Sequence, residues 1–196
     1  MSQGTLTKVT ARTAAEVCRA VQLGDEAKKL LRDGLTPRAF LDELVAKKHY
    51  PDAVRFLAFA LPKREAVWWA CLCARQAYSG GADAKILAAL AASEKWVTDP
   101  SDANRRAAFA AAQAADIGNP AGSTGVAVFF SGGSIAPPNV PEVKPPERAT
   151  AQAVAGAVML AAVMKEPEKM AAKYQKYLTL GIEVGNGANR WPEKRP

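Results

Sequence analysis

The apolar positions of this 196-residue chain recur mostly at the spacing of an amphipathic helix. Within residues 37–46, for example, Phe40, Leu41, Leu44 and Val45 fall at i, i+1, i+4 and i+5. That spacing places the four side chains on one stripe of a helix, where they can face a core. Patterns of this kind predict a chain built from helices.

Two segments depart from this pattern because they are apolar on every side. The middle of the stretch 61–79 carries no charge and holds the adjacent pair Trp68 and Trp69. A helix that is apolar all round is a buried helix, so this stretch is expected to be the central helix of the fold. The run 153–164 is also wholly apolar, which predicts a second buried helix.

Capping signals predict where several helices begin. Thr13 and Glu16 have the spacing of a capping box, in which the two side chains satisfy free backbone N–H groups at a helix start. Thr36 followed by Pro37 combines an N-cap residue with a proline at the first helical position. Further helices are expected to begin at Asp25, Pro51, Pro62, Asp83 and Pro100. Glycines predict helix ends at Gly34, Gly80–Gly81 and Gly118.

Residues 118–147 differ in composition from the rest of the chain. They contain five glycines followed by five prolines, and a proline-rich segment is extended and semi-rigid. Val126–Phe130 is the one strand-like run, and with no partner strand in the sequence it can also be interpreted as a helical turn on the core. Beyond this segment, two helices are expected at about 147–164 and 167–184.

The predicted fold class is all-α. It is an antiparallel helical bundle of short and medium helices, with a Gly/Pro-rich irregular segment before a C-terminal helix pair. The 41 alanines support it, because alanine is the best helix former. We expect one domain, with residues 1–117 as the bundle core, 118–147 as a strap or linker, and 148–196 as a helix pair and tail that pack on the core.

Charge and cysteine usage narrow the class of protein. The net charge of +7 is spread out, and no block reaches five like charges, so nucleic acid is not the expected partner. Three cysteines without framework spacing favour free thiols in a reducing cytoplasm. The N-terminus lacks the apolar segment of a signal peptide, and the 153–164 run is too short to span a bilayer. A cytoplasmic location without a membrane span is expected.

No set of residues in the sequence points to catalysis. The single histidine, His49, lies at a junction between expected helices, whereas a catalytic base needs a nucleophile and an orienting group within reach. Cys71 and Cys73 would lie about 200° apart around a helix, so their thiols cannot bind one metal ion. We therefore predict no catalytic residue, no metal site and no cofactor.

The first candidate binding site lies on the expected central helix. Arg64, Trp68 and Arg75 share one face, and Glu65 lies beside them. Two arginines that bracket an indole suggest cation–π stacking and a polar recognition site. The alternative is a packing cluster whose charges are satisfied at both ends, since aromatics at helical spacing normally belong to a core.

The second candidate is an anion loop within residues 118–134. Its glycines and hydroxyls could present backbone N–H groups to an anion. The sequence lacks the G-x-x-x-x-G-K-[ST] pattern, and no lysine lies between Arg106 and Lys144, which argues against a nucleotide and for a plain loop. The residues of this candidate are Gly122, Ser123, Thr124, Gly125, Gly132 and Gly133.

The third candidate is a stripe of lysines near the C-terminus. Lys165, Lys169, Lys173 and Lys176 fall at i, i+4, i+8 and i+11 of an expected helix. Such a stripe could contact nucleic acid or acidic lipid. The alternative is the solvated face of an ordinary amphipathic helix.

The stretch LPKREAVWWACLCAR, residues 61–75, resembles a family of uncharacterised, mostly helical bacterial proteins. The resemblance rests on Leu61-Pro62, Arg64-Glu65-Ala66, Trp68-Trp69 and Ala70-Cys71. It implies an association with gene clusters of type VI secretion and related contractile systems, and it implies no enzymatic activity.

Three functions follow as hypotheses. The leading one is a non-enzymatic bacterial adaptor or accessory protein in a larger assembly, with an unidentified protein partner. The second is a small-ligand or nucleotide-binding module that uses the 118–134 loop with Arg64 or Arg75. The third is weak nucleic-acid binding through the lysine stripe.

Overall fold

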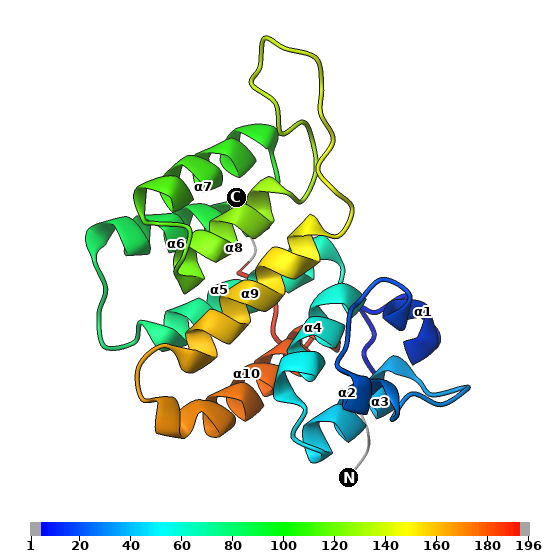
Figure 1. The fold of residues 1–196 in the computed structure, drawn as a ribbon. Helices are drawn as coiled ribbons and strands as arrows, with labels where there is room; N and C mark the ends of the chain where they lie inside the picture. Colours follow the sequence, from blue (N-terminus) through cyan, green and yellow to red (C-terminus); the bar gives the residue numbers. More distant parts are fainter. Residues whose placement is uncertain (1–4, 193–196) are drawn as a thin grey trace.

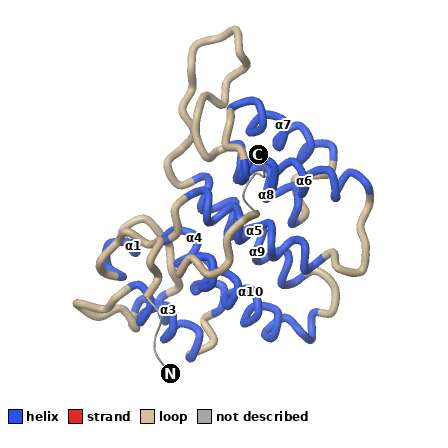
Figure 2. The backbone as a smooth tube through the Cα atoms, turned by 180° about the vertical axis from the view of Figure 1, so that it is seen from behind, coloured by secondary structure: helices blue, strands red, loops and turns tan. Residues whose placement is uncertain are grey.

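The computed structural model describes residues 5–192, and within that range it contains ten α-helices, one short 3₁₀ helix and no strand (Figure 2). The all-α prediction is confirmed. None of the helices in this part of the chain combines the length and hydropathy that a bilayer-spanning segment requires. The elements are α1 (Ala14–Cys18), α2 (Asp25–Lys28), α3 (Pro37–Ala46), α4 (Tyr50–Ala60), α5 (Lys63–Ala77), α6 (Ala84–Thr98), α7 (Asp102–Ala114), α8 (Pro120–Phe129), α9 (Ala149–Val163), η1 (Pro167–Lys169) and α10 (Met170–Gly185).

The predicted capping signals begin these helices. The backbone N–H of Glu16 donates to Thr13 Oγ1 over 3.4 Å, and Glu16 accepts from the N–H of Arg12 over 3.1 Å. Thr36 caps α3 in the same way, through the N–H of Ala39. Two predicted ends are wrong: α2 ends at Lys28, well before Gly34, and α7 ends at Ala114, before Gly118.

Helix α5 lies at the centre of the bundle, as predicted (Figure 1). It packs against α6, α8, α9 and α10. Trp69 is fully buried, and its Nε1–H donates to the carbonyl of Tyr177 on α10 over 2.7 Å. This bond satisfies the one polar atom of the indole and fixes α10 against α5.

Helix α9 shares the centre with α5. It contacts α4, α5, α8 and α10, and its buried residues include Val154 and Val158. The apolar run 153–164 is therefore a core helix, which confirms the interpretation of its composition.

The structure corrects the prediction for the first half of the 118–147 segment. Residues 120–129 form helix α8, which Asn119 begins by accepting from two backbone N–H groups. The strand-like run Val126–Phe130 is the end of this helix. A Cβ at Gly125 would lie 2.6 Å from Ala112 Cβ of α7, so the glycine lets the two helices approach closely.

The irregular part of the segment is residues 130–148, here named the proline loop. It leaves the end of α8, rises above the bundle and returns to the start of α9 (Figure 1). Its position makes it the most prominent departure from the packed helices.

Candidate functional site

The tip of the proline loop is one of the two longest exposed stretches of the described chain, together with residues 165–172. Residues 137–144 are all exposed, and Val140 and Val143 keep 50% of their accessible surface. Exposed valines beside prolines do not stabilise the monomer by burial. The tip is therefore available for contact with another molecule.

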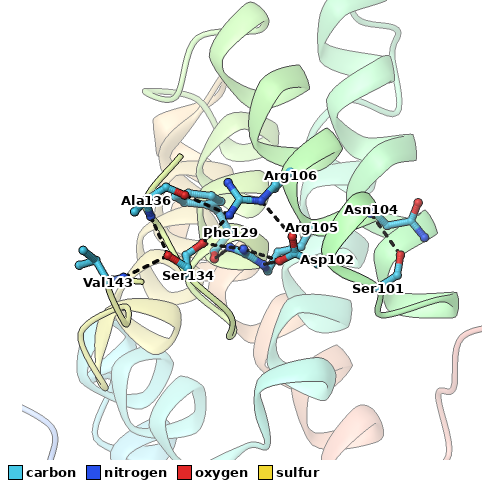
Figure 3. Close-up of polar contacts among 9 residues, drawn as sticks. All are labelled: Ser101, Asp102, Asn104, Arg105, Arg106, Phe129, Ser134, Ala136 and Val143. Carbon is cyan, nitrogen blue, oxygen red and sulfur yellow. Dashed lines mark hydrogen bonds and ion pairs between the residues drawn. The ribbon is translucent and has the colours of Figure 1, made fainter. Parts of the chain in front are cut away.

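The two arms of the proline loop are joined at its base. Ser134 Oγ accepts from the N–H of Ala136 and from the N–H of Val143, each over 3.1 Å (Figure 3). The N–H of Ile135 donates to the carbonyl of Val143 over 2.8 Å. These bonds close the loop, so its tip projects from a fixed base.

Two arginines of α7 hold this base on the bundle. Arg105 is only 3% exposed, and its guanidinium donates to the carbonyls of Phe129 and Ser134 over 2.7 and 2.8 Å. Arg106 donates to the carbonyls of Ser134 and Ala136, each over 3.0 Å (Figure 3). The planar fork of arginine suits such convergent bonding.

Asp102 compensates the charge of both arginines. Its carboxylate accepts from Arg105 Nη2 over 2.6 Å and from Arg106 Nε over 2.9 Å. These hydrogen bonds hold the pKa of Asp102 below its usual value. We call Asp102, Arg105 and Arg106 the arginine clamp.

Gly133 is adapted to the arginine clamp. Its φ is +63°, and a Cβ there would lie 3.0 Å from Arg105 Nη2 and 3.0 Å from Asp102 Oδ1. Only glycine combines that backbone conformation with so close an approach. Gly132 lies beside it in the same turn, and in place of an anion loop this turn forms the base of the proline loop.

The other half of the predicted anion loop is not a loop but part of a helix. Four of its residues lie inside α8, namely Gly122, Ser123, Thr124 and Gly125. The N–H of Gly122 donates to Asn119 Oδ1, and the N–H of Ser123 donates to the carbonyl of Asn119. A Cβ at Gly122 would lie 2.1 Å from the carbonyl oxygen of Asp116, so this glycine serves close packing. Glycine that permits backbone contact and glycine that forms a loop look alike in a sequence.

The candidate site on α5 is divided by the structure. Arg64 and Arg75 are about 16 Å apart along the helix, and each has its own partners. Arg75 pairs with Glu94 of α6 through two contacts of 2.7 Å, and that hydrogen bonding raises the pKa of Arg75. Arg64 donates to the carbonyl of Val97 at the end of α6 over 2.6 Å.

The predicted cation–π contact involves a different tryptophan. Arg64 lies over the ring of Trp191 at 4.2 Å, near the end of the described chain. Trp68 is buried in the core, and its Nε1 has no hydrogen-bond partner within residues 5–192. Arg64, Glu65 and Trp191 line a small cavity of about 190 Å³. Arg64 therefore joins a polar surface cavity, while Trp68 belongs to the core.

The predicted lysine stripe is also divided. Lys165 lies in a turn, Lys169 ends η1, and only Lys173 and Lys176 lie on α10. Lys173 Nζ donates to the carbonyls of Met164 and Lys165, which caps the end of α9. Lys169 pairs with Glu166, and Lys176 donates to Gln76 over 2.6 Å. Three of the four ammonium groups thus bind within the protein.

No group of three or more His, Cys, Asp and Glu side chains in the described range could hold a metal ion. Burial raises the pKa of Cys71 and Cys73, which are fully buried. His49 precedes the first turn of α4 without a side-chain capping bond.

Sequence reasoning missed the arginine clamp. The available signal was the pair Arg105-Arg106 inside an alanine-rich helix, with Asp102 three and four residues earlier. That spacing predicts an i,i+3 and i,i+4 ion pair. It does not predict that the guanidinium groups reach carbonyls of the proline loop.

Comparison with known protein families gives a match over most of the chain. A family of unknown function (DUF6931) matches residues 40–185, from within α3 to the end of α10. No curated protein and no solved structure matches the chain. The match is consistent with the expected uncharacterised family.

Proposed function

Because the chain belongs to the DUF6931 family of unknown function, we propose its function from its own geometry: it is a non-enzymatic adaptor whose proline loop docks on a partner protein. The single observation that carries this proposal is the exposed tip, residues 137–144, on a base that the arginine clamp holds in place.

The chemistry of the tip suits protein recognition. Proline fixes φ, so a proline-rich segment has little conformational entropy to lose when it binds. Aromatic-lined grooves recognise such segments in other proteins. Val140 and Val143 add exposed apolar surface at the same place. The partner we propose is a protein with a groove that takes up this extended apolar segment.

We propose that the adaptor acts in the bacterial cytoplasm, within a contractile secretion system of the type VI class. The resemblance of residues 61–75 supports the setting. The described free cysteines, Cys18, Cys71 and Cys73, support a reducing compartment.

The test is a native pull-down with mass spectrometry, performed with the wild type and with Val140→Asp. The charge at the tip should abolish recovery of the partner, because a carboxylate cannot enter an apolar groove without a large desolvation cost. Binding of the recovered protein is then repeated with purified components. Its gene neighbourhood tells whether it belongs to a secretion cluster.

Val163→Asp is the matched control, because Val163 is also an exposed valine, at the end of α9. It should retain the partner. A protein that stays partnerless in every lysate, or a partner that Val140→Asp retains at the wild-type level, would contradict the proposal.

A further inference from the structure

We propose that a cavity at the start of α9 binds a phosphate monoester that carries a small apolar group. The cavity has a volume of about 420 Å³ and lies where the end of α1, the start of α5 and the start of α9 meet. That volume lies within the range of pockets for small ligands. The site is separate from the tip of the proline loop and from every residue predicted to bind.

Cationic side chains predominate in the cavity wall. Arg19, Lys63 and Arg148 line it together with one carboxylate, Glu147, which leaves an excess of two positive charges. Within residues 5–192, neither Arg19 nor Arg148 has a side-chain hydrogen bond or ion pair, whereas Lys63 donates to the carbonyl of Ser131 over 3.0 Å. A phosphate monoester carries a charge of about −1.5 to −2 near neutral pH, which balances this excess better than a single carboxylate does.

The N-terminus of α9 opens at this cavity. This helix of 15 residues begins after Arg148, and no side chain caps it. The first N–H groups of a helix lack partners inside the helix, and together with the helix dipole they favour an anion. Thr150 and Ala151, in the first turn, both line the cavity.

Thr150 gives the independent indication of a ligand. It is 1% exposed, and its Oγ1 has no hydrogen-bond partner in the described part of the chain. A buried hydroxyl without a partner costs about 1–3 kcal/mol. Thr150 is the second residue of α9, and it is one of the residues that line the cavity. A phosphate oxygen there would satisfy this hydroxyl group.

A neighbouring cavity provides room for the apolar part of the ligand. It has a volume of about 320 Å³ and shares Ala20, Phe59 and Arg148 with the first. Phe59 and Met159 provide apolar surface, and a Cβ at Gly156 would meet no heavy atom within 4 Å, so this wall is open. The second cavity is also lined by Gln22, Arg55 and Gln152. The two cavities thus offer one small molecule a basic end and a second end that combines apolar and polar surface.

The test is isothermal titration calorimetry of the full chain at low salt with phenyl phosphate, inorganic phosphate and phenylacetate. Phenyl phosphate should bind more tightly than the other two, because inorganic phosphate lacks the apolar ring and phenylacetate carries only one negative charge. Arg148→Gln should weaken its binding about tenfold. Equal or tighter binding of phenylacetate, or no measurable binding of phenyl phosphate, would overturn the proposal.

Thr150→Val separates binding from folding. This substitution removes an unsatisfied hydroxyl and keeps the side-chain shape, so the free protein should be at least as stable as the wild type. Its affinity for phenyl phosphate should fall about threefold to tenfold. Arg190→Gln is the charge control, because it removes the same charge at a different cavity and should leave affinity unchanged. Wild-type affinity in both Arg148→Gln and Thr150→Val would place the ligand elsewhere and refute the site.

Discussion

The indole of Trp69 occupies the space that a side chain at Gly181 would need. A Cβ at Gly181 would lie 2.7 Å from Trp69 Cε2 and 2.9 Å from Trp69 Nε1. The same indole donates to the carbonyl of Tyr177, one turn earlier on α10. The contact between α5 and α10 therefore depends on a glycine in the middle of a helix, where glycine is otherwise unfavourable.

Gly181→Ala should destabilise the protein, because the new methyl group forces Trp69 and Leu57 to move within the core. Overpacking of this kind costs about 1–3 kcal/mol. Urea unfolding monitored by tryptophan fluorescence measures the loss.

Gly156→Ala is the matched control for this substitution. Gly156 also lies inside a helix, α9, but a Cβ there would meet nothing within 4 Å. It should stabilise the protein by about 0.4–1 kcal/mol through helix propensity. If Gly181→Ala and Gly156→Ala change the free energy of unfolding equally, the space that Trp69 occupies beside Gly181 does not matter for stability.

Arg105→Lys should loosen the base of the proline loop. Lysine keeps the charge but lacks the fork that reaches the carbonyls of Phe129 and Ser134. Bonds of this type to a charged group contribute about 1.5–3 kcal/mol each, so the free energy of unfolding should fall by about 2–4 kcal/mol. Amide exchange at Ile135 and Val143 should accelerate.

Arg106→Lys provides the comparison within the arginine clamp. Arg106 is more exposed than Arg105, and Ser134 keeps its bond to Arg105 when Arg106 changes. The free energy of unfolding of Arg106→Lys should be lower than that of the wild type by about 1 kcal/mol. If both lysine variants exchange amides at the wild-type rate, the clamp does not hold the loop.

The contribution of Asp102 should depend on pH. Its pKa in the folded protein is lower than the ordinary value of 3.8, because Arg105 and Arg106 donate hydrogen bonds to the carboxylate. A lowered folded pKa gives stability that is present above 3.8 and is lost as pH falls through the folded value. Solvent screening limits this contribution of Asp102 to the free energy of unfolding to about 1 kcal/mol. The stability difference between wild type and Asp102→Asn should therefore shrink in acid, and a difference that grows in acid would contradict this assignment.

The three thiols should differ in reactivity. Burial raises the pKa of Cys18 to about 11, although this residue is partly exposed, and Cys71 and Cys73 are fully buried. A thiol-specific reagent at mildly alkaline pH should modify Cys18 slowly and the other two only after unfolding. Cys18→Ser should abolish the reaction of the native protein. Rapid modification of a second thiol would show that the core around α5 opens.

Local sequence signals could predict most helix starts but not every helix. The sequence is sufficient to identify signals that lie within four residues or within one helix. Examples are the capping box at Thr13, the Thr36-Pro37 start and the apolar stretch of α5. The sequence predicts only the end of helix α8, as one of two interpretations of Val126–Phe130, because Gly122 and Gly125 lower helix propensity in the first half. The two glycines let α8 lie close to Asp116 and Ala112, and this packing outweighs the lower helix propensity. The packing exists only in the folded chain.

The sequence by itself determined that this protein is all-α, with buried helices at α5 and α9, because caps and apolar periodicity are local properties. Only the tertiary structure decided which distant groups meet. It placed Arg64 over Trp191, Arg105 on the carbonyl of Ser134 in the proline loop, and Thr150 in the wall of a basic cavity. Such contacts depend on how helices pack, and packing follows from the shape of the whole core rather than from the spacing of residues along one helix.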